Sequence, residues 1–175
     1  AINVQNDLIP PVVKPKIPIE AGALFTGVYQ FAVCYANIDG NEQSSYYSKT
    51  NPLPIYEDRF SSYENTEGSK ANQLTDKAIP VVFSNLDIRY DYINLAVIKT
   101  VQGTPTYELI ATLPISTKEY IYTGRETTRL LSIDNILGLY PDYYNSKTIT
   151  SANNYLIRAN MSTQDEANYQ PFANL

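Results

Sequence analysis

The sequence has 175 residues, of which 43% are hydrophobic and 18% are charged, and its net charge is −5. These values are typical of a globular protein with one domain, and they exclude the dense positive face with which nucleic-acid-binding proteins contact phosphates. No apolar run approaches the roughly 20 residues that span a bilayer. The first residues lack the basic and apolar regions of a signal peptide. A start at Ala1 without methionine is expected of a processed product or of a part of a longer protein.

Residue types that carry much of enzyme chemistry are scarce. The sequence has no histidine, which is the commonest general base and transition-metal ligand. Its one cysteine, Cys34, allows no disulfide within the chain. Sixteen tyrosines and no tryptophan are present, and this choice of aromatic residues favours β-structure.

Residues 1–24 are predicted to form an extended, proline-rich N-terminal arm. The stretch LIPPVVKPKIPIE contains prolines that remove amide donors and hold the backbone extended. Its aliphatic residues need burial, so a disordered tail or an edge strand laid on the domain is the alternative interpretation. The arm residues predicted to contact another protein are Ile9, Pro10, Pro11 and Val12.

Residues 28–37 predict a central strand followed by a hairpin turn. Large and small side chains alternate along it, so we expect the large face in the core and the small face covered by another part of the chain. Asp39-Gly40 tolerates the positive φ angles of a turn, and residues 43–49 would return antiparallel. The large face comprises Tyr29, Phe31, Val33 and Tyr35.

Residues 52–76 have no sustained period and many polar side chains, which predicts a long loop. Loops of this length are uncommon in compact domains unless they are functional or disordered. We therefore interpret this loop as a contact site, and the alternative is a solvated insertion without a function.

A second group of strands is predicted between Ala78 and Gly124. The segments AIPVVFSNL, RYDYINLAVIKT, TYELIATL and KEYIYT have the alternation of strands, and VQGTP supplies a turn. Strands at intervals of about ten residues favour an all-β sandwich over a parallel α/β sheet. We therefore expect the sandwich to occupy residues 25–124.

Residues 125–175 are predicted to form a short helix and a β-like C-terminal extension. The helix is SIDNILG, in which Ser132 can cap the start and Gly138 can end the last turn. Residues 147–150 and 154–159 are predicted strands of the extension.

No pattern of residues predicts catalysis, a cofactor or a metal site. Acidic residues such as Asp87 and Asp91 have no spacing that marks a glycosidase pair, and neither NIDGNE nor LDIRYD has the full spacing of a calcium loop. Cys34 lies inside the regular strand, where we expect a buried structural thiol rather than a nucleophile. We therefore expect no enzymatic activity, no cofactor and no bound metal.

Tyrosines supply the remaining candidates for a protein interface. Neighbouring strand residues point to opposite faces, so one member of each Tyr-Tyr pair should be exposed or covered by a partner. A further tyrosine lies in the predicted loop. These interface candidates are Tyr46, Tyr47, Tyr63, Tyr143 and Tyr144.

Two segments resemble a fibronectin type III module. FSNLDIRYDYINLAVIKTVQGTPTYELIATLPISTKEYIYTG is similar to its middle strands, and GVYQFAVCYANIDGNEQSSYYSK is similar to its late strands. Together they cover most of residues 27–124. The resemblance implies an immunoglobulin-like or fibronectin type III-like sandwich, which is a fold that carries many unrelated functions.

The order of the parts resembles the tail stabilisation proteins of crAss-like bacteriophages. These parts are an aromatic strand with a DGN turn, an insertion, the block LDIRYDYI and then YNSKTITSANNYLIRANM. The resemblance implies a non-enzymatic structural subunit of the head-to-tail junction or tail, repeated as a homo-oligomeric ring. Its implied partners are portal, connector or tail subunits, without nucleic acid or membrane. Its implied location is the virion, assembled in the host cytoplasm.

The sequence leaves two other functions open. Exposed tyrosines and the loop over residues 52–76 would suit an extracellular adhesion or carbohydrate-binding module, although the absence of tryptophan is unfavourable. An enzyme is the third possibility, and it would need a catalytic partner supplied by another chain.

Overall fold

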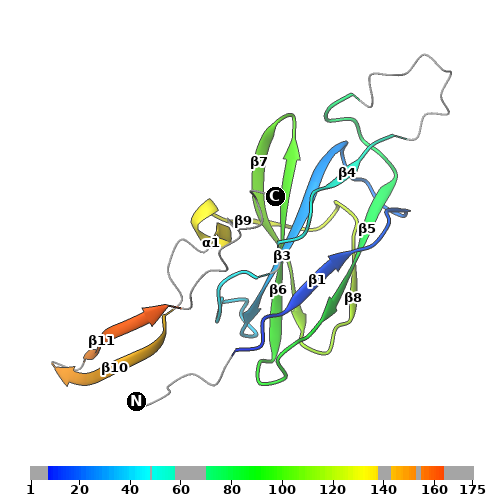
Figure 1. Ribbon diagram of the computed structural model, residues 1–175. Coiled ribbons are helices and arrows are strands. Elements are labelled where there is room, and N and C mark those ends of the chain that lie inside the picture. The colour runs from blue at the N-terminus through cyan, green and yellow to red at the C-terminus, as the bar shows by residue number, and fades with distance from the viewer. Residues whose placement is uncertain (1–7, 48, 58–69, 138–142, 153–154, 164–175) are drawn as a thin grey trace, which may run out of the picture. The chain divides into compact units, whose positions relative to one another are not determined.

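The computed structural model describes residues 8–47, 49–57, 70–137, 143–152 and 155–163. The chain divides into two compact units. One is Ile9–Gly138, and the other combines Ala1–Leu8 with Leu139–Leu175. The larger unit is an all-β sandwich with one short helix, as the sequence predicts (Figure 1).

The first sheet of the sandwich is antiparallel and has five strands. Two neighbouring strands of this sheet, Tyr92–Val101 and Thr104–Pro114, are joined by a tight turn. The turn consists of Gln102 and Gly103, whose φ angles of 60° and 82° suit a two-residue hairpin loop. In spatial order, the strands are β4 (Leu53–Ile55), β3 (Gly27–Ala36), β6 (Tyr92–Val101), β7 (Thr104–Pro114) and β9 (Arg129–Leu130).

The second sheet is built around β5 (Lys77–Ser84). Val81 and Val82 pair with both β1 (Val12–Pro15) and β8 (Glu119–Tyr122), so these two strands lie on opposite edges of β5. A two-residue strand, β2 (Ile19–Glu20), pairs with the start of β5.

The interior between the sheets is aliphatic and aromatic. The ring of Tyr122 in β8 contacts two rings of β3, with centroids 6.2 Å from Tyr29 and 5.9 Å from Phe31. Tyr29, Phe31, Val33 and Tyr35 are all at most 2% exposed, which confirms the prediction that this face of β3 enters the core. The other sheet contributes Val13, Ile79, Val81 and Phe83.

The opposite face of β3 carries small side chains and is also buried. Ala32 and Cys34 lie in a second cluster with Ala96, and this cluster is closed by Tyr46 and by Ile136 from α1 (Ile133–Leu137). The helix thus supplies the cover that the small side chains of β3 predict. The predicted cap is also present, because the backbone N–H of Asn135 donates to Ser132 Oγ at 3.3 Å.

The hairpin turn after β3 is held by a buried asparagine. Gly40 has a φ of 75°, and a Cβ at this position would lie 2.9 Å from Thr112 Oγ1. Asn94 donates from Nδ2 to the Gly40 carbonyl at 2.9 Å and accepts from Thr112 Oγ1 at 2.7 Å. The chain then returns antiparallel along β3, as predicted for residues 43–49, and it does so through isolated bridges at Glu42 and Tyr47.

The proline-rich arm is an edge of the second sheet in its described part. Lys16 donates its N–H to the Pro80 carbonyl at 2.8 Å, and bonding alternates along an antiparallel strand. The N–H groups of Lys14 and Val12 therefore face β5. The backbone nitrogens of positions 11, 13 and 15 point away from β5, and two of these three residues are prolines. The edge-strand interpretation is confirmed for β1 and β2, because the prolines take positions where no inward donor is needed.

Both described ends of the predicted long loop are paired. Leu53–Ile55 forms β4 against β3, and Leu74 forms a bridge with Phe25, while residues 58–69 lie outside the described residues. The division into residues 1–24, 25–124 and 125–175 and the fibronectin type III likeness stay predictions.

The smaller unit contains one described antiparallel hairpin. It comprises β10 (Tyr143–Ala152) and β11 (Tyr155–Thr163), with an irregular register between Tyr143 and Asn145. Both strands are longer than the segments predicted from sequence.

The variant Asn94→Ala tests the support of the hairpin turn. It leaves the buried Gly40 carbonyl and Thr112 hydroxyl without their partner, so we expect the free energy of unfolding to fall by about 2–3 kcal/mol. Urea denaturation measures this change. The exposed Asn51→Ala should stay within about 0.5 kcal/mol of the parent, and an unchanged midpoint for Asn94→Ala would contradict the assigned role.

Candidate protein interface

The N-terminal arm is fastened to the sandwich by the hydroxyl of Tyr35. This hydroxyl donates to the Ile9 carbonyl at 2.7 Å and accepts from the Asp87 backbone N–H at 2.8 Å. The Tyr35 ring also stacks on Tyr90, with centroids 4.2 Å apart and an interplanar angle of 10°. One side chain of β3 therefore connects the arm with the loop between β5 and β6.

The carboxylate of Asp87 strengthens the same junction. Arg89 Nε donates to Asp87 Oδ1 at 2.8 Å, and the Ile9 backbone N–H is 3.5 Å from Asp87 Oδ2. The Asp87 side chain is 2% exposed. Hydrogen bonds from Arg89 lower the pKa of Asp87 to about 2, so this carboxylate stays charged over almost the whole accessible pH range.

The predicted arm residues differ in what they offer to a partner. Ile9 is 42% exposed, Pro10 is exposed, Val12 is half-buried and Pro11 is buried. Asn85 Nδ2 donates to the Pro10 carbonyl at 3.0 Å, so the backbone here is held from several directions. From Ile9 onward, the arm presents its side chains from a fixed backbone.

The predicted tyrosines are not gathered at one site. Tyr46 is 6% exposed and belongs to the cluster with Cys34, so the structure places it in the core rather than at the surface. Tyr47 is half-buried and pairs with Val33 through both backbone hydrogen bonds. Tyr63 and the side chains of Tyr143 and Tyr144 lie outside the described residues.

Among the described residues, the structure brings together no set of side chains suited to catalysis or to metal binding. Burial raises the pKa of the Cys34 thiol to about 12, which keeps it protonated and unreactive at neutral pH. Among the residues described, no group of three or more His, Cys, Asp and Glu is arranged to hold a metal ion. The helix described here is too short to cross a membrane.

One end of the sandwich exposes apolar side chains, and two of them, Tyr56 and Leu74, belong to the loop over residues 52–76 that sequence reasoning interprets as a contact site. Ile17, which is 84% exposed, and Tyr56, which is 57% exposed, line one hollow beside β2 and β4. Leu74, which is 59% exposed, lines the neighbouring hollow. The first hollow has a volume of about 280 Å³. Its lining is Ile17, Pro18, Leu53, Pro54, Ile55, Tyr56 and Lys77.

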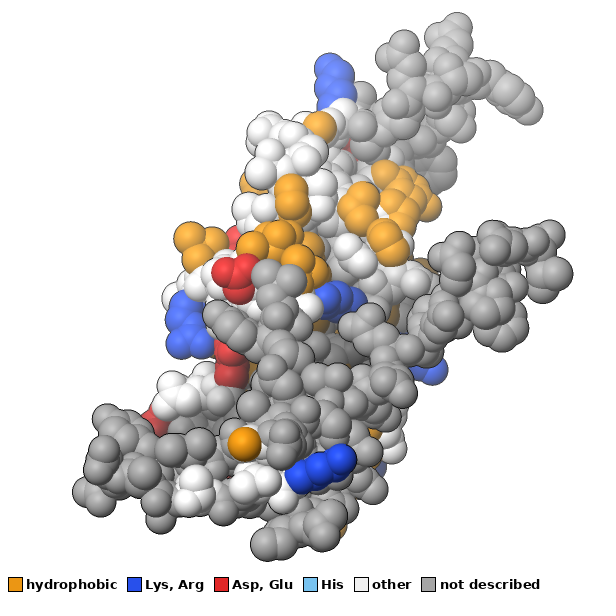
Figure 2. Space-filling model, turned by 60° about the vertical axis from the view of Figure 1, so that its left-hand side comes forward, with side chains coloured by type: hydrophobic (Ala, Val, Ile, Leu, Met, Phe, Trp, Pro, Cys, Tyr) orange, Lys and Arg blue, Asp and Glu red, His pale blue; other side chains and the backbone are white. Residues whose placement is uncertain are grey.

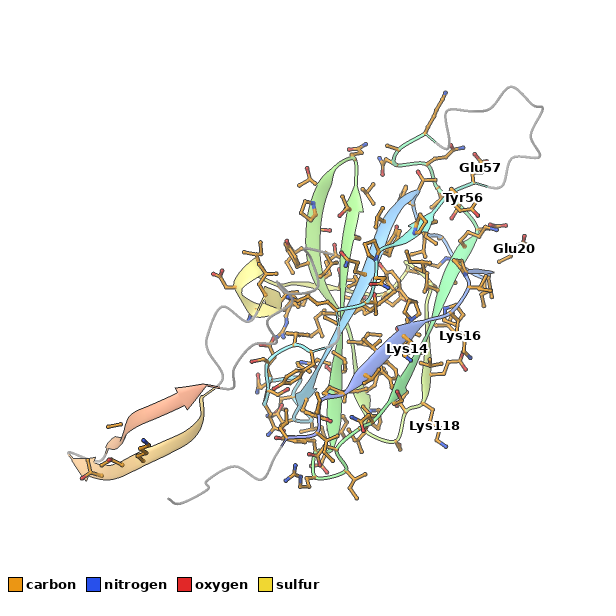
Figure 3. All side chains as sticks on the ribbon, in the orientation of Figure 1. Lys14, Lys16, Glu20, Tyr56, Glu57 and Lys118 are labelled. Atoms are coloured by element: carbon orange, nitrogen blue, oxygen red, sulfur yellow. The ribbon has the colours of Figure 1, made fainter. Side chains whose placement is uncertain are left out.

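Carboxylates border this apolar hollow. A neighbouring hollow of about 250 Å³ shares Lys77 and is lined by Glu20, Glu57 and Asp76 together with Leu74 and Thr75. Figure 3 shows Glu20, Tyr56 and Glu57 at the same end of the sandwich. We call the two hollows with these residues the acidic end.

Elsewhere on the surface, hydrophobic side chains form separate groups. Figure 2 shows such groups on the face that it presents, with charged side chains beside several of them. Leu130 is 76% exposed, and Ile133 and Leu137 of the helix region are 46% and 44% exposed. An apolar patch with a polar border is the usual anatomy of a protein–protein interface.

Comparison with known protein families matches residues 1–172 with the family described as Crassvirus muzzle protein. The chain belongs to this family. A search of the curated proteins found no match. This muzzle-family protein is therefore a structural protein of a crAss-like phage particle, where it interacts with other virion proteins. The match does not confirm the narrower resemblance to tail stabilisation proteins.

The variant Tyr35→Phe tests the fastening of the arm. It removes the hydroxyl that joins Ile9 to Asp87, so we expect the unfolding free energy to fall by about 1–3 kcal/mol. In the variant, the rate of amide hydrogen exchange should also increase more around Ile9 than in β6. Tyr56→Phe, which changes an exposed tyrosine, should alter neither quantity, and unchanged exchange at the arm in Tyr35→Phe would contradict the assigned role.

The pH dependence of stability tests the Asp87 carboxylate. Its pKa is lower in the folded state than the ordinary value of 3.8, so its contribution is fully present above about pH 4 and is lost as the pH falls toward 2. The stability difference between the parent and Asp87→Asn should therefore be largest above pH 4 and narrow below it. Denaturation at a series of pH values measures this difference, and a difference independent of pH would contradict the prediction.

Proposed function

We propose that this muzzle-family protein is a non-enzymatic structural subunit at the head-to-tail junction or tail, where it clamps neighbouring virion proteins. The family match over residues 1–172 carries the proposal. The partners are portal, connector or tail subunits, and the chain itself is repeated as a homo-oligomeric ring. The particle is assembled in the host cytoplasm.

The distribution of exposed and buried groups supports this function. The sandwich buries its thiol and the tyrosines Tyr29, Tyr35, Tyr46 and Tyr122. The described surface carries apolar groups at the arm, at the acidic end and around α1. A pre-formed scaffold with apolar side chains at its periphery loses little conformational entropy when neighbours bind. The described structure thus has the properties of an assembly unit.

The arm contributes to this clamp through Ile9 and Pro10. Both side chains are exposed, while their backbone is fixed by Tyr35, Asp87 and Asn85. A fixed apolar segment can enter a groove of a neighbour without first becoming ordered. Tyr47, Tyr63, Tyr143 and Tyr144 remain further candidates for the interface.

Reconstitution with portal, connector and tail proteins of the same phage tests the proposed function. We expect the chain to enter a ring-shaped complex, visible by electron microscopy, and Ile9→Asp/Pro10→Asp to enter it at least about tenfold less efficiently, because charge replaces buried apolar contacts. Ile38→Asp, at a 72% exposed position of the hairpin turn, is the matched control. Failure of the parent chain to join any virion protein would overturn the proposal.

A further inference from the structure

The larger unit is connected to the smaller unit at both of its ends. Ala1–Leu8 of the smaller unit precedes Ile9, and Leu139–Leu175 follows Gly138. The last elements before the second connection are β9 and α1, which lie within residues 129–137 (Figure 1). We call residues 129–137 the latch. A displacement of the smaller unit therefore reaches the larger unit through Ile9 and through the latch.

The connection at Ile9 is held by buried and charged groups. The Tyr35 hydroxyl donates to the Ile9 carbonyl at 2.7 Å and accepts from the Asp87 N–H at 2.8 Å. Arg89 Nε donates to Asp87 Oδ1 at 2.8 Å and to Oδ2 at 3.0 Å. Displacement of Ile9 would leave the buried Tyr35 hydroxyl without its acceptor, which is costly, so this connection should stay fixed.

One buried side chain supplies most of the apolar contact of the latch. Ile136 is 0% exposed and packs in the cluster with Cys34 and Ala96. Leu131 is half-buried against the same cluster, and the other seven latch residues are exposed. Because hydrophobic stabilisation scales with the apolar area removed from water, docking of the latch depends mainly on Ile136.

The hydrogen bonds of the latch lie at the edge of the first sheet or on the surface. β9 pairs with β7 over two residues, and the Leu131 N–H donates to the Tyr107 carbonyl at 2.9 Å. Asn135 Nδ2 donates to Glu42 Oε2 at 3.4 Å, where both side chains are exposed. Water can replace these partners, so release of the latch leaves no buried polar group unsatisfied. Five residues are too few for a helix to persist alone in water, so α1 should unwind on release.

The core between the two sheets does not include the latch. Tyr29 and Phe31 point from β3 toward Tyr122 of the other sheet. Ile136 lies against the opposite face of β3, because side chains alternate along a strand. Release of the latch therefore leaves the contacts between the sheets in place.

We propose that the latch undocks from β3 and β7 as one local unit while the two sheets remain folded. When extended at about 3.3 Å per residue, its nine residues span roughly 30 Å. Release thus lengthens the connection to Leu139–Leu175, while the connection at Ile9 stays fixed. A chain with a releasable latch can meet neighbours at different distances. The inference goes beyond the proposed function, because release is a property of the free chain.

Amide hydrogen exchange of the full chain, followed by NMR at increasing urea concentrations below the unfolding transition, tests the release. The Leu131 amide reports the latch, and amides in the middle of β6 report unfolding of the sandwich. After correction for intrinsic rates, we expect Leu131 to be protected but to exchange at least about a hundredfold faster than β6. Its rate should depend little on urea, because local release exposes little surface.

Two substitutions separate release of the latch from unfolding of the sandwich. Ile136→Ala removes the main contact of the latch and should raise the exchange rate of Leu131 at least about thirtyfold. Ile79→Ala, its matched control in the core between the sheets, destabilises the docked and the released chain equally relative to the unfolded chain. It should raise the exchange rate of β6 about thirtyfold or more and leave that of Leu131 unchanged. If Ile79→Ala does not fold, Ile79→Val gives the same comparison with a smaller increase in β6.

Four results would overturn the inference. Leu131 could exchange with the rate and urea dependence of β6, or without any protection. The Ile79 variant could accelerate Leu131 as much as β6, which would mean that the latch leaves only when the sandwich unfolds. Ile136→Ala could leave the rate of Leu131 unchanged, which would mean that other contacts hold the latch. None of these results would remove the proposed function, because a chain with a fixed latch can also join a particle.

Discussion

β3 is packed on both of its faces, and the arrangement of the larger unit depends on this constraint. Its large side chains reach the ring of Tyr122 in the other sheet, and its small side chains lie under Ile136 of α1. Because side chains alternate along a strand, a shift of one residue in its pairing would place Phe31 under the helix and Ala32 in the core. The register with β6 therefore also fixes the position of Tyr35, where the arm is fastened.

Sequence reasoning predicted the elements whose pattern is set locally. The alternation in β3, β5, β6 and β7 and the cap at Ser132 depend on neighbouring residues, and these elements form where expected. The strands β4 and β9 have only three and two residues, which is too few to show a period. Their pairing partners decide them, and those partners are distant in the sequence.

The candidate interface was less predictable, because tertiary pairing creates it. The alternation along a strand predicts that one member of the Tyr46-Tyr47 pair lies outward but not which one, and in the structure Tyr46 is the buried member, in the cluster with Cys34. Tyr56 and Leu74 lie in the loop that sequence reasoning interprets as a contact site, but no local pattern predicts that Ile17 of the arm lines the same hollow as Tyr56. Aliphatic residues within the proline-rich stretch were the signal that the arm needed burial, and these residues are Ile9, Val12, Val13, Ile17 and Ile19.

Pro11 and Pro15 have a consequence for a protein that is crowded against its neighbours. An open β-edge with free N–H groups recruits further strands, and repeated recruitment leads to cross-β aggregates. Because Pro15 has no N–H and Pro11 occupies the position before the strand, Val13 is the one residue of β1 whose N–H still faces away from β5, and a single donor is too few to start a ladder with an incoming strand. Many copies can therefore be concentrated during particle assembly without merging through this edge into one growing sheet, and the number of neighbours is left to contacts between side chains.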